Sequence, residues 1–262
     1  MLGLGSGFYK LAGGDNSANI YKELKELSNY TDLDVHFDFS TLVGVHGSEV
    51  LNSVNLGAGG AALNITSNSG VPLLDKVSLS RPCVDFPNTG DDDITLNMAN
   101  PFQTTGKAMT FFIVMVLDVD TTQMLVSGAP DGDQDFIQLF SAGRMRVRLN
   151  NGDATSVITS NTNDSTISYA PTVNTPMVMV WKKDSSGESE FFNDNGLFTA
   201  ALTDTGDANW TIQVFGGTTA GSNVDFNGKI CEVGLYDADI GRNNSQILAK
   251  ELSTKWGINR RE

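Results

Sequence analysis

Apolar and polar residues alternate along most of the chain from about residue 31 to residue 236. The first such stretch alternates the apolar residues Leu33, Val35, Phe37 and Phe39 with the polar residues Asp34, His36 and Asp38. A period of two is the pattern of a strand that buries one face. We therefore predict a strand here, with His36 on its solvent-facing side.

Similar patterns of apolar residues predict nine further strands, separated by clusters of Gly, Asn, Asp and Ser. They cover residues 94–98, 109–118, 122–128, 135–140, 145–150, 156–160, 176–183, 189–194 and 211–217. The segments 135–140 and 145–150 flank a short connection that contains Gly143, which predicts a hairpin. Many short strands at this density indicate an all-β sandwich or barrel.

Residues 1–30 follow a different pattern. The first fourteen residues mix five glycines with the apolar residues Leu2, Leu4, Phe8, Tyr9 and Leu11. This mixture is too flexible for a regular element and predicts an arm. Within residues 15–30, Ile20, Leu24 and Leu27 share one helical stripe, which predicts a short amphipathic helix. We assign residues 1–30 to an arm with a short helix, and residues 31–262 to one domain.

The C-terminal part also has helical spacing. Asn243, Asn244 or Ser245 can cap the start of a helix, and Gly257 stands where a left-handed C-cap is expected. One face of this predicted helix carries Ile247, Leu248, Leu252 and Trp256. The chain is thus predicted to end in a helix that packs on the sandwich.

Charge and composition exclude several classes of partner. Seventeen Lys and Arg against 31 Asp and Glu give a formal charge of −14, which repels a nucleic-acid backbone. The longest apolar run, residues 109–117, is far shorter than the roughly 20 residues that span a bilayer, so no membrane insertion is expected. Cys83 and Cys231 lie too far apart in sequence for a zinc pattern, and both are expected in the core.

The block FNGKICEVGLYDADIGRNNSQILAKELSTKWGI, residues 226–258, resembles the closing signature of concanavalin A-like (laminin-G-like) jelly-roll domains. Three upstream segments agree with this pattern: GKAMTFFIVMVLD, the hairpin 177–196 with its Asn195-Gly196 turn, and TIQVFGG. The resemblance covers about residues 31–258. It implies an all-β fold, a two-sheet antiparallel jelly-roll sandwich with a C-terminal helix. This fold serves lectins, glycanases, adhesion modules and virion proteins, so it does not fix the function.

Catalytic patterns are missing from the sequence. Glycanases of this family carry carboxylates in a spacing like E-x-D-x-x-E on one strand, and no such segment occurs. Glu188 and Glu190 are interpreted as solvated hairpin residues. His36 and His46 are the only histidines, and neither has a catalytic neighbour in sequence. We predict that the chain is not an enzyme, with a glycoside hydrolase built on carboxylates from different strands as the weaker alternative.

Two loops remain as candidate binding sites. Asp131, Asp133 and Asp135 place three carboxylates at alternate positions, a spacing that suits either a solvated loop or a calcium ion. Trp210, flanked by Asp207 and Asn209, can be either a core residue or an aromatic platform for a sugar. Apart from this possible calcium ion, no cofactor is expected.

An arm followed by a lectin-like sandwich, with no secretion signal at its start, resembles the virion accessory proteins of tailed bacteriophages. The resemblance implies a capsid decoration or tail component, made in the host cytoplasm and released by lysis. Residues 1–30 would dock on other virion proteins, the protein would be an oligomer on the particle, and the sandwich could adhere to glycans. The alternative is a free-standing carbohydrate-binding module, calcium-assisted, whose loops 129–136 and 204–210 contact sugar.

Overall fold

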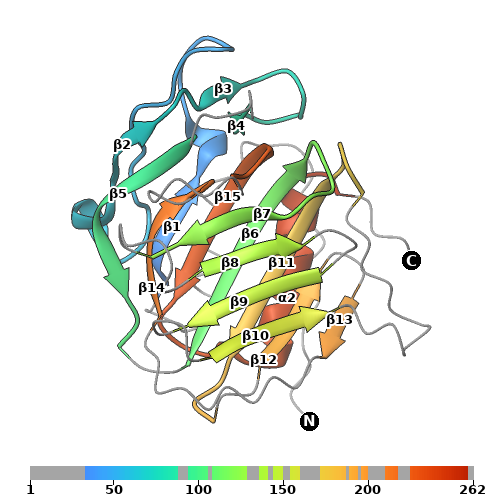
Figure 1. Ribbon diagram of the computed structural model, residues 1–262. Helices are drawn as coiled ribbons and strands as arrows, with labels where there is room; N and C mark the ends of the chain where they lie inside the picture. The colour runs from blue at the N-terminus through green and yellow to red at the C-terminus, as the bar shows by residue number, and fades with distance from the viewer. Residues whose placement is uncertain are drawn as a thin grey trace, which may run out of the picture.

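The structure is a computed structural model with two antiparallel sheets and one C-terminal helix (Figure 1). It describes residues 33–87, 94–105, 108–128, 136–140, 144–149, 154–159, 172–186, 189–193, 196–199, 210–217 and 225–258. Residues 1–30, predicted to form an arm and a short helix, lie outside this part of the chain. The two-sheet antiparallel sandwich with a C-terminal helix is confirmed.

The first sheet, sheet A, has eight strands. Its path runs β13-β12-β11-β6-β15-β4-β3, and β1 pairs with β15 beyond the end of β4. The central strands β6 and β15 are nine residues long each. The strands are β1 (Leu33–Asp38), β3 (Leu73–Asp75), β4 (Cys83–Phe86), β6 (Met109–Leu117), β11 (Pro176–Lys183), β12 (Ser189–Asn193), β13 (Gly196–Thr199) and β15 (Gly228–Tyr236).

The second sheet, sheet B, has seven strands in the order β10-β9-β8-β7-β14-β5-β2. In Figure 1 it lies in front of sheet A, and the helix lies behind both. The predicted hairpin is confirmed, because β8 and β9 pair antiparallel. The strands are β2 (Ile65–Ser69), β5 (Thr95–Gln103), β7 (Gln123–Ser127), β8 (Phe136–Phe140), β9 (Arg144–Leu149), β10 (Ala154–Thr159) and β14 (Thr211–Phe215). Two 3-10 turns, η1 (Phe39–Thr41) and η2 (Gly60–Leu63), precede β2.

Sheet A is covered on both faces. All nine residues of β6 are buried, and its side chains alternate between two hydrophobic layers. Phe111 and Ile113 belong to the core between the sheets, whereas Phe112 and Val114 belong to a second layer beneath the helix. A strand buried on both faces needs a continuous apolar run, which explains the sequence MTFFIVMVL. Cys83 and Cys231 are both buried in the second layer, as predicted.

The helix α2 (Gly241–Lys255) supplies that second layer. Leu248, Leu252 and Trp256 are buried against sheet A as predicted, but Ile247 is 37% exposed. The predicted capping residues also differ, because Asn243 to Ser245 lie inside the helix. The first turn is instead capped by Asp239, whose Oδ1 accepts a hydrogen bond from Gly241 N at 2.7 Å. Gly257 has a φ of 65°, which confirms the left-handed C-cap.

The sequence located most strands to within two residues at each end, although it gave β5 as 94–98 where the strand extends to Gln103. It did not predict β2, β3 and β4, which are short or flanked by polar residues. These three strands lie at the end of the molecule where the chain first folds after β1 (Figure 1). Among the described residues, no helix has the length and apolar content needed to cross a bilayer.

Candidate binding surfaces

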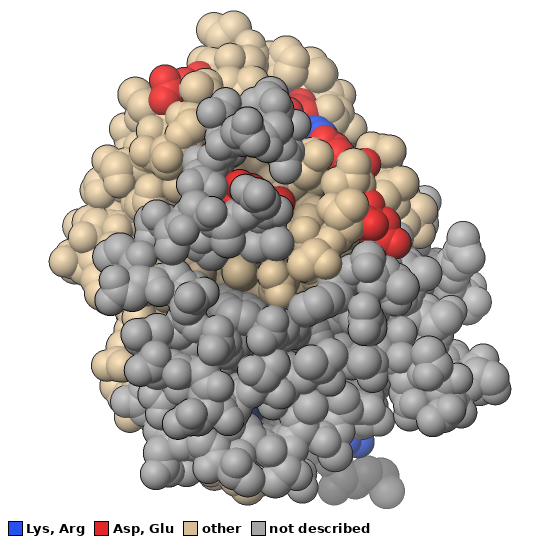
Figure 2. Space-filling model, viewed as in Figure 1, with Lys and Arg blue, Asp and Glu red and all other residues tan. Residues whose placement is uncertain are grey.

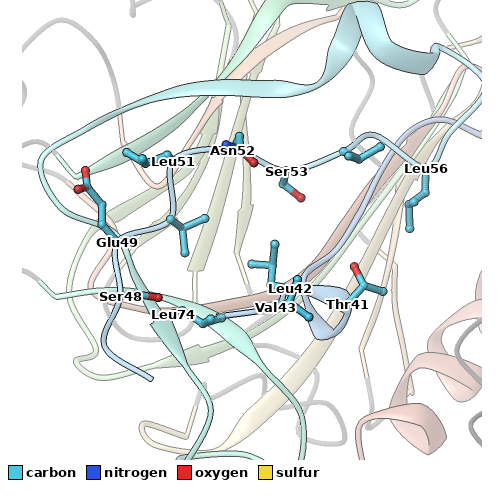
Figure 3. Close-up of a pocket in the computed structure, with 12 residues that line it drawn as sticks. Thr41, Leu42, Val43, Ser48, Glu49, Leu51, Asn52, Ser53, Leu56 and Leu74 are labelled. Carbon is cyan, nitrogen blue, oxygen red and sulfur yellow. The ribbon is translucent and has the colours of Figure 1, made fainter. Parts of the chain in front are cut away.

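A pocket of about 370 Å³ opens at the end of the sandwich that contains β2, β3 and β4 (Figure 3). It lies between the loop after η1 and the segment 48–56, which runs roughly opposite that loop. Its volume is within the range of roughly 300–1,000 Å³ that is typical of ligand sites. The lining residues are Thr41, Leu42, Val43, Ser48, Glu49, Val50, Leu51, Asn52, Ser53, Val54, Leu56 and Leu74.

The wall of this pocket is tied to both sheets. Glu49 forms a bridge with Leu73 of β3 in sheet A, and Ser53 forms a bridge with Ile65 of β2 in sheet B. Ser53 N donates to Ile65 O at 3.2 Å, and Ile65 N donates to Ser53 O at 2.9 Å. The segment 48–56 therefore crosses the open edge of the sandwich and is held at both ends.

Asn55 fixes the same segment to β1. Its Oδ1 accepts a hydrogen bond from His36 N at 2.7 Å, and its Nδ2 donates to Asp34 O at 2.8 Å. Asn55 N in turn donates to Asn64 Oδ1 at 2.8 Å. A buried amide with these three partners holds a fixed loop conformation. The sequence pattern does not single out Asn55, because an asparagine in a polar loop carries no spacing signal.

Seven of the twelve residues that line the pocket are aliphatic and five are polar, and exposed aliphatic side chains surround it. Nine large hydrophobic residues of the described chain are exposed, and seven of them lie between residues 43 and 77. Val43 is 94% exposed and Val54 is 64% exposed, and both line the pocket. No aromatic residue is among the lining side chains. We define Val43, Val45, Leu51, Val54 and Leu56 as the aliphatic rim, a surface suited to an apolar occupant.

A second candidate surface follows from the strand register of sheet B. Met145 pairs with Leu139 and Val147 pairs with Ile137, and both β8 partners belong to the core between the sheets. The alternate positions of β9 therefore belong to the outer face of sheet B. These positions are occupied by Arg144, Arg146 and Arg148, three of the seven arginines in the chain. We call them the β9 arginine row.

The arginine row lies in an acidic molecule. Figure 2 shows acidic side chains at several places over the described upper part of the face that contains sheet B. By contrast, β8, β9 and β10 contain no Asp or Glu at all. Gln138, the register partner of Arg146, is only 6% exposed. By sequence, the arginine row is thus the only charge on these three strands, in a chain of net charge −14.

Beneath α2 lies a buried charge cluster of His36, Asp38, Glu232 and Lys255. His36 Nε2 contacts Glu232 Oε1 at 2.8 Å, and Lys255 Nζ donates to Glu232 Oε2 and Asp38 Oδ2 at 2.7 Å each. Trp256 Nε1 also donates to Glu232 Oε2 at 2.8 Å. The prediction of a surface His36 is wrong, because α2 covers the polar face of β1 and leaves His36 1% exposed.

The partners of Glu232 control its charge. Burial alone would raise the pKa of this carboxyl, but the hydrogen bond with His36 and the charge of Lys255 lower it to about 2. Glu232 is therefore ionised at neutral pH although it is fully buried. The cluster has no access to solvent for a substrate, so we assign it the structural role of holding α2 on sheet A.

Other carboxylates of the described chain are also paired. Glu190, predicted to be solvated, has a side chain only 13% exposed and forms ion pairs with Arg242 and, at 3.4 Å, with Lys182. Lys229 Nζ lies 3.6 Å from Asp85 Oδ1 and 3.2 Å from Asp118 Oδ1. The ammonium of Lys229 lies between these two carboxylates and offsets part of their charge. This arrangement does not favour the acid and nucleophile pair of a glycoside hydrolase.

Most of the predicted site residues lie outside the described part of the chain. They are Leu2, Leu4, Phe8, Tyr9 and Leu11 of the arm, Asp131, Asp133 and Asp135 of the calcium candidate, and Asp207 and Asn209 of the sugar candidate. Within the described residues, no group of three or more His, Cys, Asp or Glu is arranged to hold a metal ion.

Trp210 is described, and it is a core residue. Its side chain is 0% exposed, and its ring centroid lies 5.6 Å from that of Phe111 and 5.7 Å from that of Trp181. Both contacts are edge-to-face, in the core between the sheets. The interpretation of Trp210 as an exposed platform for a sugar is therefore corrected, because no face of the indole reaches solvent.

No protein-family model matches the sequence, and no curated protein matches it significantly. Among solved structures, the receptor binding domain of botulinum neurotoxin type G is similar, with a TM-score of 0.54, 10% identity and coverage of 84% of this chain and 51% of that one. The botulinum neurotoxin serotype D ligand binding domain in complex with N-acetylneuraminic acid gives a TM-score of 0.56, 10% identity and coverage of 87% and 52%. The chain spans about half the length of these domains.

A third structure, the CBM40 of a Ruminococcus gnavus sialidase bound to α2,3-sialyllactose, gives a TM-score of 0.44 and 16% identity over 56% of this chain and 84% of that one. At these identities the likenesses concern the fold. The chain thus shares its two-sheet sandwich with the receptor binding and ligand binding domains of these neurotoxins.

Proposed function

We propose that the chain is a non-catalytic carbohydrate-binding module that takes an acidic glycan on the outer face of sheet B. The observation that carries this proposal is the β9 arginine row. Alternate residues of a strand are about 6.6–6.8 Å apart, so the row offers a regular series of cations. Guanidinium groups bind carboxylate and sulfate oxygens through paired hydrogen bonds, which suits the repeating anionic groups of an acidic polysaccharide.

The charge pattern favours a specific site over general attraction. The whole chain carries −14, so distant electrostatics repel polyanions and only a local cationic strip can bind them. The strip consists of the β9 arginine row on strands that lack acidic residues.

The fold supports a binding role by analogy. One similar structure was solved with N-acetylneuraminic acid, which is an acidic sugar. The pairing of Glu190 and of Asp85 with cations agrees with a module that binds without hydrolysing its ligand. The comparison favours the carbohydrate-binding alternative over the virion component as the main function.

The test is binding to an array of acidic glycans and their carboxyl-reduced or desulfated counterparts. We expect the acidic forms to bind at least about tenfold more tightly, and Arg146→Gln to remove that preference. Lys250→Gln is the matched control, because Lys250 is an exposed cation on α2, behind sheet A (Figure 1). Equal binding of acidic and neutral glycans, or no binding to either, would overturn the proposal. A parallel measurement with chelator tests calcium assistance.

Assembly into a phage particle, predicted from residues 1–30, stays a prediction. It is tested separately by banding source particles on a density gradient and quantifying peptides of this chain by mass spectrometry. Stoichiometric co-banding would support a virion role, and recovery only in the soluble fraction would discard it.

A further inference from the structure

The pocket at the end of the sandwich is surrounded by exposed aliphatic side chains, which a sugar ligand would not need. We propose that this pocket and its aliphatic rim are the docking site for the apolar segment Leu2–Leu11 of the same chain. The inference is independent of the glycan site, which lies on β9. In this proposal the N-terminal segment packs on the sandwich and covers the exposed aliphatic residues of the rim.

The exposed aliphatic side chains of the rim suit an apolar partner. Val43 and Val45 are 94% and 77% exposed, and Leu51 and Val54 are 54% and 64% exposed. Large aliphatic side chains grouped in this way on one surface mark a contact site, whereas singly scattered ones do not. The rim is also held in place by the backbone bridge at Ser53 and by Asn55, so it is preformed.

The lining is poorly suited to a sugar. A sugar ring stacks on aromatic faces and satisfies its hydroxyls with several polar groups, and none of the lining residues is aromatic. Glu49 is the one charged lining residue, and its Oε1 already accepts a hydrogen bond from Asn68 Nδ2 at 2.9 Å. Aliphatic contact is therefore the main attraction that this pocket offers.

The segment Leu2–Leu11 has the complementary composition. Five of its ten residues are large and apolar, and Lys10 is the one charged residue in the first fourteen. Lys10 and Glu49 give the segment and the pocket opposite charges. The glycines at positions 3, 5 and 7 let the backbone lie close to a surface between successive apolar side chains.

The stretch of chain that would link the docked segment to the sandwich joins it beside the pocket. Leu33 O accepts a hydrogen bond from Ala58 N at 2.8 Å, and His36 O accepts one from Leu56 N, also at 2.8 Å. The described chain thus begins next to Leu56, which lines the pocket. Even if residues 15–30 form a helix of about 24 Å, residues 1–14 can extend to about 45 Å and return. A tether of this kind gives an effective concentration of about a millimolar, which favours the same chain over a neighbour.

Hydrogen exchange of residues 41–56 tests the proposal in the full chain. We expect exchange in this segment to rise at least about tenfold after deletion of residues 1–14, and a synthetic peptide of residues 1–14 to restore protection. The double variant Leu4→Asp and Phe8→Asp should act like the deletion, while Ser17→Asp, outside the docking segment, should not. On the pocket side, Leu51→Asp should release the segment, and Val77→Asp, outside the lining, should leave exchange unchanged.

Unchanged exchange of residues 41–56 in the deletion would overturn the proposal, provided that the sandwich keeps its near-UV circular dichroism. Light scattering distinguishes docking within one chain from docking between two chains of a dimer. We expect a monomer with full protection, and protection that depends on a dimer would overturn docking within one chain. Acidic-glycan binding by the same variants should be unchanged, so a failure here is separate from a failure of the proposed function.

Discussion

Two regions of the molecule reverse the usual distribution of residue types. Beneath α2, the buried charge cluster places two carboxylates, a lysine and a histidine where water is excluded. On the other side of Asn55, which accepts a hydrogen bond from His36 N, the aliphatic rim leaves valines and leucines in solvent. The difference shows that burial follows from what covers a surface, and not from the polarity of the residues that form it.

Each region is tolerated for a different reason. The charges beneath α2 are stable because every one has a partner within 2.8 Å, from His36 on β1 to Trp256 after α2. Unpaired charges in such a layer would be strongly destabilising. The rim has no such requirement, since an exposed methyl group costs little in a monomer. Breaking a contact should therefore have large effects in the first region and small effects in the second.

The largest expected effect comes from neutralising the centre of the buried charge cluster. Glu232→Gln leaves Lys255 with one carboxylate, Asp38, and replaces the carboxylate that contacts His36 with an amide. We expect the free energy of unfolding to fall by about 3–5 kcal/mol, as measured by urea denaturation at pH 7. Glu49→Gln at the pocket is the matched control and should change it by less than about 0.5 kcal/mol.

A loss below 1 kcal/mol for Glu232→Gln would contradict this comparison. It would mean that the layer beneath α2 admits water and that Lys255 is solvated without its partner.

The second largest effect is expected from acidification, which should lower the stability that the buried charge cluster provides. The pKa of Glu232 is about 2 in the folded protein and 4.5 as its ordinary value. A lowered folded pKa gives stability that is present above about pH 4.5 and is lost as the pH falls toward 2. We expect this carboxyl to contribute on the order of 3 kcal/mol to that loss. In denaturation curves at several pH values, the Glu232→Gln variant should show a shallower decline below pH 4.5 than the parent.

The sequence predicted the sandwich because its strands obey a simple period. Alternation located β1, β8 and β9, and the apolar segment 109–118 located β6. Gly257 also correctly predicted where α2 ends. These signals are local, so they survive without knowledge of the tertiary contacts.

The cluster and the pocket could not be predicted in the same way. His36 lies on the polar side of an alternating strand, and its burial depends on α2, which begins about 200 residues later. Lys255 is similarly a helix-end cation by sequence, and only the tertiary fold places it beside Glu232. The rim comes from a loop whose shape depends on Asn55. Whether these residues are buried or exposed depends on contacts between segments far apart in the sequence, and not on the local sequence pattern.

A smaller effect is expected where the backbone of β15 approaches an aromatic ring. A Cβ at Gly234 would lie 2.4 Å from Phe112 Cζ and 2.9 Å from Val35 O. Because Phe112 is fully buried in the layer beneath α2, its ring has little room to move. Gly234→Ala should lower the free energy of unfolding by about 1–3 kcal/mol in thermal or urea denaturation. An unchanged value would show that this layer is loosely packed.

The smallest effect is expected from a valine in the exposed region, and it sharpens the comparison when paired with a buried valine. Val77 is 70% exposed, so Val77→Thr should change the free energy of unfolding by less than about 0.5 kcal/mol. Val114 is 0% exposed beneath α2, and the same substitution there buries a hydroxyl at a cost of about 1–3 kcal/mol. Urea denaturation of both variants measures the difference directly. Equal effects at the two sites would mean that residues 43–77 are covered as completely as the layer beneath α2, and the contrast between the regions would disappear.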